Sequence, residues 1–181
     1  MKFDDSYEAS AKKYTPERTW VLFVAEAPPE NLNRYFYFEN VTRDDWLWIA
    51  LMKALYPSEW DWGHTKAERQ RKDAWLLKFQ KSRFRVIDAV KTPICGSDSK
   101  RVGLIQSAAQ ELIDEIKEID PKQIVLIKAT VHEALFQRLR DAHLPVVNRN
   151  ALPFPCSSWQ TQFHDEFRRL IDTGELRLHA I

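Results

Sequence analysis

A continuous, mostly apolar run at Thr19–Ala25, with the sequence TWVLFVA, constrains the fold of this chain more than any other feature. A strand with one face in water alternates apolar and polar residues, whereas a continuous run is typical of a strand buried on both faces in a parallel sheet. The run stops at Glu26, and Pro28 and Pro29 then prevent further strand pairing. The sequence therefore predicts a buried strand with a carboxylate at its carboxyl end.

Further apolar segments predict three more strands and the helices between them. The strands are predicted at Phe84–Val90, Gln123–Lys128 and Pro145–Val147, and the helices at Trp46–Tyr56, about 67–82, Leu104–Ile119, about 130–141 and about 157–172. Strands that alternate with helices are typical of a mainly parallel sheet covered on both faces. We therefore predict an α/β fold, a three-layer α/β/α sandwich with a mainly parallel four-stranded sheet. We expect one domain over residues 19–181, preceded by an N-terminal extension over residues 1–18.

Composition and charge exclude several classes of protein. The 181 residues carry 27 Lys and Arg against 26 Asp and Glu, so the net charge of +1 excludes a surface that is polycationic throughout, although not a local basic face. Four glycines are too few for a glycine-rich phosphate loop. Cys95 and Cys156 are too few for an all-cysteine cluster, and the five histidines show no metal-binding spacing, so we expect no metal and no cofactor.

The distribution of apolar residues predicts where the protein resides. No apolar run approaches the roughly 18 residues that a membrane span needs, so we expect no membrane partner. Residues 1–13 are charged and polar, without the apolar core of a secretory signal peptide, so a cytoplasmic location is expected. We also expect a monomer.

The ends of the predicted strands indicate where a ligand would bind. In open parallel sheets, ligands bind beyond the carboxyl ends of the strands, because helix N-termini gather there. Glu26 and Asp88 each follow a hydrophobic strand directly. Burial would raise the pKa of such a carboxyl, as a general base requires, but a carboxylate at a strand end also serves as a helix cap or as the partner of an arginine. Spacing alone leaves both interpretations open.

The loop after the first strand contains four consecutive aromatic residues, Tyr35–Phe38. A loop on the surface cannot bury all four rings equally, so some of them are candidates for stacking on a flat ligand such as a nucleobase. Packing into a small core beneath the loop explains the same pattern.

A basic stretch at residues 66–85 has eight Lys and Arg residues against two acidic ones. A helix of this composition can follow a phosphate backbone, and its candidate contacts are Lys66, Arg69, Arg71 and Lys72. The alternative is a solvated helix face, which is the usual role of a charge run.

Taken in order, the four strand ends resemble those of the uracil-DNA glycosylase superfamily. Val24–Pro29 (VAEAPP) is similar to the first motif of the iron–sulfur branch, a strand running into Gly-Glu-Ala-Pro-Gly, and Ile87–Lys91 (IDAVK) falls where that branch has Thr-Asn-Val-Val-Lys. Pro121–Thr130 resembles the next strand and helix start, and Pro153–Ser158 (PFPCSS) falls where the family has His-Pro-Ser. The resemblance covers nearly the whole chain, residues 19–173.

This resemblance implies a DNA-repair enzyme that flips a damaged base out of the duplex and hydrolyses its N-glycosidic bond. Glu26 would position the attacking water, and Asp88 would read the edge of the base. Phe36 or Tyr37, beside Pro28, would stack on the base. The loop with Pro155, Ser157 and Ser158 would enter the duplex.

Several departures from the family pattern limit what the resemblance implies. The last loop lacks the histidine that assists the leaving base, and Asp88 stands where the family has an asparagine. The cluster cysteines are absent, and Ala25 and Pro29 replace glycines around the first motif. Two functions therefore remain open: a divergent base glycosylase acting on DNA or another nucleic acid, and a non-catalytic nucleic-acid or nucleotide-binding module that uses the same pocket. A flat small molecule is a third possible ligand.

Overall fold

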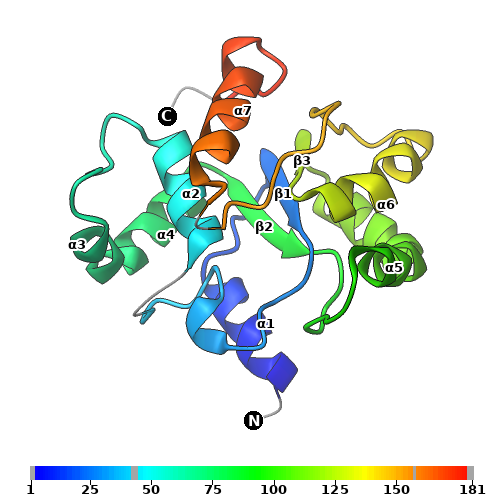
Figure 1. The fold of residues 1–181 in the computed structure, drawn as a ribbon, viewed down its shortest axis with the longest axis horizontal. Coiled ribbons are helices and arrows are strands. Elements are labelled where there is room, and N and C mark those ends of the chain that lie inside the picture. The colour runs from blue at the N-terminus through cyan, green and yellow to red at the C-terminus, as the bar shows by residue number, and fades with distance from the viewer. Residues whose placement is uncertain (1–2, 42–44, 157, 179–181) are drawn as a thin grey trace.

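The structure, a computed structural model, describes residues 3–41, 45–156 and 158–178. Figure 1 shows a central sheet with helices on both sides, as the sequence predicts. The strands are β1 (Val21–Ala25), β2 (Phe84–Asp88) and β3 (Gln123–Leu126). The helices are α1 (Phe3–Lys13), α2 (Trp46–Leu55), α3 (Thr65–Gln70), α4 (Lys72–Lys81), α5 (Asp98–Ile119), α6 (Ala129–Asp141) and α7 (Gln160–Asp172), with a short 3₁₀ helix at Leu32–Arg34. Within the described residues, no helix is long and apolar enough to cross a membrane.

All three strands are parallel, in the order β2-β1-β3, so β1 is central. Every residue of β1 is buried, which confirms that its continuous apolar run lies between two layers. Val21, Phe23 and Ala25 pack into a core with α1, α2, α4 and α7, whereas Leu22 and Val24 pack into a second core with α5 and α6. The alternation of side chains along a strand therefore divides the apolar run between the two faces of the sheet.

The expected four-stranded sheet is wrong, because the sheet has three strands. Next to β3, the chain at Val146 makes only an isolated bridge to Ile124. Two residues further along the edge, the side chain of Asn148 takes the place of a strand. Its Oδ1 accepts from the N–H of Leu126 at 2.9 Å, and its Nδ2 donates to the carbonyl oxygen of the same residue at 3.0 Å. The edge of β3 is therefore paired without a fourth strand.

A side chain also covers the opposite edge of the sheet. The Tyr37 hydroxyl accepts from the N–H of Val86 in β2 at 2.7 Å and contacts its carbonyl oxygen at 3.1 Å as donor. Both sheet edges thus end in a polar side chain that satisfies one backbone N–H and one C=O, which would otherwise be buried without partners.

Some helix boundaries differ from those that the sequence predicts. The helix expected at 67–82 is broken at Arg71 into α3 and α4. The helix expected to start at Leu104 starts at Asp98, because the Ser97 side chain accepts from the N–H of Lys100 and caps the helix there. Within the expected N-terminal extension, α1 forms and its Tyr7 is buried in the same core as β1.

Candidate functional site

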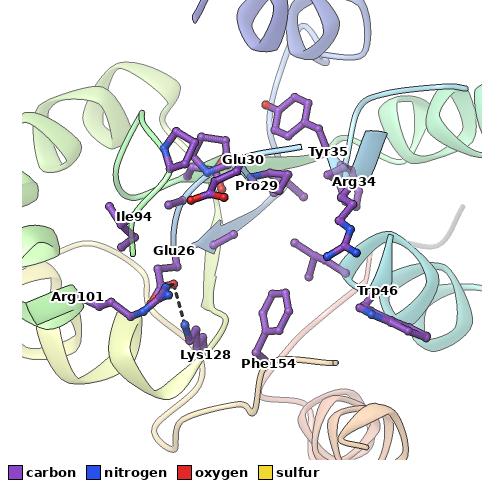
Figure 2. Close-up of a pocket in the computed structure, with 18 of the residues that line it drawn as sticks. Glu26, Pro29, Glu30, Arg34, Tyr35, Trp46, Ile94, Arg101, Lys128 and Phe154 are labelled. Atoms are coloured by element: carbon purple, nitrogen blue, oxygen red, sulfur yellow. Dashed lines mark hydrogen bonds and ion pairs between the residues drawn. The ribbon is translucent and has the colours of Figure 1, made fainter. Parts of the chain in front are cut away.

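A pocket of about 490 Å³ lies at the carboxyl ends of the strands. Figure 2 shows Arg101 and Lys128 on one side of it, Arg34 and Trp46 on the other, and the ring of Phe154 directed into it. Each strand contributes a polar side chain at or just after its end. These are Asp88 from β2, Glu26 after β1 and Lys128 after β3.

Glu26 is the most highly bonded side chain of the pocket. Its Oε2 accepts from Lys128 Nζ at 2.7 Å and from Arg101 Nη1 at 2.5 Å, while its Oε1 accepts from Thr130 Oγ1 at 2.6 Å (Figure 2 draws the bond to Lys128). Lys128 and Thr130 come from the start of α6, and Arg101 comes from the first turn of α5. Two helix starts on one side of the sheet therefore fix the carboxylate of Glu26.

The pKa of Glu26 is lowered rather than raised. Burial acts to raise it, but the hydrogen bonds from Lys128 and Thr130 and the charges of Lys128 and Arg101 outweigh that effect. Glu26 is therefore ionised at neutral pH, and of the two interpretations that the sequence left open, the structure shows the carboxylate as the partner of an arginine, Arg101. Because two cations contact one carboxylate, the cluster retains an excess positive charge.

The pKa of Asp88 is raised to about 7. Burial is the main cause; the charge of Lys91 lowers the pKa and that of Glu115 raises it. No described residue donates a hydrogen bond to the Asp88 carboxyl, which also lines a second cavity between α1 and β2. Asp88 is thus a mixture of acid and carboxylate near neutral pH, which is the raised pKa that the sequence left open for a strand-end carboxyl.

Lys128 reaches Glu26 from an unusual backbone conformation. Its φ of 86° and ψ of 142° lie in a region that favours glycine, and its N–H is held by the carbonyl oxygen of Leu152 at 3.1 Å. Strained backbone of this kind is concentrated at functional sites. The conformation places the amine at the pocket while α6 starts at the next residue.

Aromatic and proline side chains form the apolar part of the pocket. Phe36 and Pro28 line it as the sequence analysis expected, together with Tyr35 and Trp46. Tyr37 does not, because its ring is buried and its hydroxyl bonds the edge of β2. From the last loop, Phe154 lines the pocket with 37% of its surface exposed. The four-residue aromatic run is therefore divided between the pocket and the core.

The basic stretch does not reach this pocket. Lys72 is fully buried, with Nζ 3.2 Å from Asp45 Oδ2, and Arg69 Nε pairs with the same carboxylate at 2.9 Å. Lys72 and Arg69 are therefore structural, and their expected contacts to phosphate are wrong for this conformation. Lys66 and Arg71 are exposed at α3, which Figure 1 shows at the outer side of the helical layer, away from the strand ends.

The loop expected to enter a duplex is only partly described. Pro155 is buried and Ser158 is exposed, and neither lines the pocket, whereas Ser157 lies outside the described residues.

Sequence reasoning missed Arg101, Lys128 and Thr130 as partners of Glu26. The sequence does indicate Lys128, because this residue ends an apolar run, as Glu26 and Asp88 do. It does not indicate Arg101, because the predicted helix starts at Leu104, whereas α5 starts at Asp98 and includes Arg101 in its first turn. In the described part of the chain, no group of His, Cys, Asp and Glu could hold a metal ion.

Together these features define an α/β protein with a mixed apolar and ionic pocket at the carboxyl ends of a parallel sheet. In comparisons with known proteins, the chain matches no family model and no curated sequence. The geometry of the pocket therefore carries the functional argument.

Proposed function

We propose that the protein is a divergent base glycosylase of the uracil-DNA glycosylase type, which hydrolyses the N-glycosidic bond of a base held in the pocket. One observation carries the proposal: Glu26 and Asp88 line the same pocket, and their surroundings shift their pKa values in opposite directions. A general acid must carry a proton near neutral pH, whereas its charged partner must stay ionised. Two carboxyl groups whose pKa values are shifted in opposite directions can fill these two roles. The strand-end motifs that resemble the superfamily meet at this pocket.

In this proposal the two carboxyl groups act on different parts of the substrate. Glu26 stays ionised, orients a water molecule and stabilises the positive charge that develops at the sugar carbon. The water oxygen bonds to that carbon as the carbon–nitrogen bond breaks, and the protonated form of Asp88 donates its proton to the departing base. The proton that the water loses returns to the Asp88 carboxylate through solvent. Phe36 and Phe154 offer the base apolar surfaces.

A screen of oligonucleotides that carry uracil, hypoxanthine, xanthine or alkylated bases tests this function. We expect release of at least one base, with Glu26→Gln and Asp88→Asn each slowing it about 10²-fold or more, while Glu118→Gln on the exposed face of α5 has no effect. Because the acid form of Asp88 is required, the rate should fall as pH rises through about 7. Release of no base, or full activity of Glu26→Gln, would exclude the enzyme.

A second candidate function, nucleotide or nucleic-acid binding without catalysis, is favoured by the excess positive charge around Glu26. Lys128 and Arg101 would attract an anionic group rather than a developing cation. Base release in the oligonucleotide screen separates this candidate from the enzyme. The salt dependence of binding then identifies the ligand, because affinity for a nucleic-acid backbone falls steeply with salt, whereas affinity for a small flat ligand does not.

A further inference from the structure

The two cations that hold Glu26 have hydrogen-bond donors that Glu26 does not use. Arg101 donates through Nε to the carbonyl oxygen of Gly96 at 3.0 Å and through Nη1 to Glu26, so its Nη2 has no acceptor among the described residues. In the same part of the chain, Lys128 Nζ donates to Glu26 alone, although an ammonium carries further N–H groups. Both cations line the pocket on one side (Figure 2), and each side chain is 23% exposed. A ligand in the pocket can therefore reach the unused donors.

The charge of this cluster is not balanced by a second acidic group. Glu26 supplies one carboxylate against two cations, and no other described carboxylate forms an ion pair with either cation. Glu30, which also lines the pocket, accepts instead from the thiol of Cys95. The cations lie in the first turn of α5 and directly before α6, where the helix dipoles add positive potential. The cluster therefore favours an anion on its pocket side.

This excess charge opposes the reaction proposed for the pocket. Positive charge develops at the sugar carbon as the glycosidic bond breaks, and the two cations beside Glu26 weaken the stabilisation that its carboxylate offers. An anion bound to the cations would cancel their excess. A nucleotide carries such an anion, because its phosphate is joined to the sugar that reacts. The pocket, with a volume of about 490 Å³, has space for base, sugar and phosphate together.

We propose that Arg101 and Lys128 bind the phosphate of the substrate, so that the pocket recognises a nucleotide rather than a base or a nucleoside alone. The Nη2 group of Arg101 and the unused N–H groups of Lys128 donate to the phosphate oxygens. The phosphate takes part in no bond change; it neutralises the cluster and leaves Glu26 to act on the sugar carbon. It belongs either to a free nucleotide or to a nucleic-acid strand. Its role in catalysis rests on the proposed function, whereas its binding does not.

Matched pairs of ligands that cannot be hydrolysed test the site. Carbocyclic analogues of 2′-deoxyuridine and 2′-deoxyinosine are titrated with and without a 5′-phosphate, and the backbone amide NMR signals of residues 101 and 128 report binding. We expect the phosphate to raise the affinity about tenfold or more. Arg101→Met should abolish this gain without weakening the ligands that lack phosphate, whereas Arg138→Met, exposed in α6, should keep it. Thermal unfolding of each variant would show that the folded state is retained.

Glu26→Gln should change phosphate binding in the opposite direction. The substitution removes the only carboxylate that pairs with the two cations among the described residues, so we expect the phosphorylated ligands to bind about tenfold more tightly and the others to bind as they do to the wild type. Unchanged or weaker binding of the phosphorylated ligands to Glu26→Gln would overturn the site. Equal affinity of the wild type for ligands with and without phosphate would also overturn it.

Trinucleotides with a central carbocyclic residue identify the source of the phosphate. If a phosphodiester on the 5′ side raises the affinity over an uncharged methylphosphonate as much as a terminal phosphate does, the substrate is a strand; if only the terminal phosphate raises it, the substrate is a free nucleotide. Base release from natural nucleosides as fast as from the nucleotides would exclude the catalytic role and leave the glycosylase intact. A gain from phosphate without release of any base would exclude the enzyme and leave the site, so the two proposals fail separately.

Discussion

The amine of Lys128 donates to Glu26, and the backbone of Lys128 has φ 86° and ψ 142°. In a residue with a side chain, this conformation costs about 1–3 kcal/mol of strain. Lys128→Gly and Lys128→Ala both remove the ion pair, but only glycine relieves the strain. We therefore expect the glycine variant to be more stable than the alanine variant by about 1–3 kcal/mol in chemical denaturation. The same two substitutions at exposed Lys117, inside α5, should rank in the opposite order. Equal stability at Lys128 would contradict the strain.

Asp88 makes the stability of the fold depend on pH. Burial raises its pKa to about 7 from an ordinary value near 3.8, so between these values the folded state binds more protons than the unfolded state. Stability therefore falls as pH rises from about 4 to about 7. Asp88→Asn removes the titrating group and so lacks this loss. We expect the free energy of unfolding of the variant, relative to that of the wild type, to rise by about 2–4 kcal/mol between pH 4 and pH 7.

Denaturant titrations at a series of pH values measure this difference. Asp114→Asn, on the exposed face of α5, provides the control and should follow the wild type at every pH. A constant difference between Asp88→Asn and the wild type would mean that the Asp88 carboxyl is solvated as well in the folded protein as in the unfolded chain.

Among the elements, the three strands of the sheet were predictable, but the edges of the sheet, where a fourth strand was expected, were not. Val21–Ala25 is a continuous apolar run, and such a run has few alternatives to a buried parallel strand. The edges depend on Tyr37 and Asn148, whose polar groups replace the backbone of a neighbouring strand. A local pattern does not distinguish an aromatic residue that lines a pocket, such as Phe36, from one that covers a sheet edge.

Removal of the Tyr37 hydroxyl should show the role of this edge. Tyr37→Phe leaves the N–H and C=O of Val86 buried without partners, and we expect it to reduce the free energy of unfolding by about 1–3 kcal/mol. Tyr14→Phe is the matched control. The Tyr14 hydroxyl bonds Glu39, which is partly exposed and can be hydrated, so this loss should be below about 1 kcal/mol. Similar losses for the two variants would mean that the Tyr37 hydroxyl does not stabilise the edge of β2.

At the scale of the whole molecule, the position of the site was predictable but its bonding was not. Parallel strands bring their carboxyl ends together, so Glu26 and Asp88 were expected at one edge of the sheet. The cations that fix Glu26 lie 75 and 102 residues further along the chain, at Arg101 and Lys128. Over such separations only the packing of α5 and α6 decides which side chains meet, and with it the direction of the pKa shift.

Lys72, the first residue of α4, contacts two segments that line the pocket, the loop after β1 and the start of α2. Its Nζ lies 3.2 Å from the carbonyl oxygen of Tyr35 and 3.2 Å from Asp45 Oδ2, and each of these residues directly precedes one that lines the pocket, Phe36 or Trp46. The ammonium is fully buried and 5.1 Å from the centre of the Trp48 ring. One buried side chain therefore joins the loop after β1, the start of α2 and the start of α4.

Lys72→Met keeps the volume of the side chain but leaves the Tyr35 carbonyl without its donor and the Asp45 carboxylate without one of its cations, so we expect a loss of about 1–3 kcal/mol in the free energy of unfolding. Asp45→Asn in the same chain should restore part of the loss, giving a coupling energy of about 1–3 kcal/mol in a double-mutant cycle. Lys78→Met, which removes a partly exposed ion pair with Glu59 from α4, should cost less than about 1 kcal/mol. Because the loss is local, amide hydrogen exchange should accelerate at residues 35–37 and in the first turns of α2, but not in α5 and α6. Uniform acceleration through both layers would show that Lys72 supports the whole fold rather than the walls of the pocket.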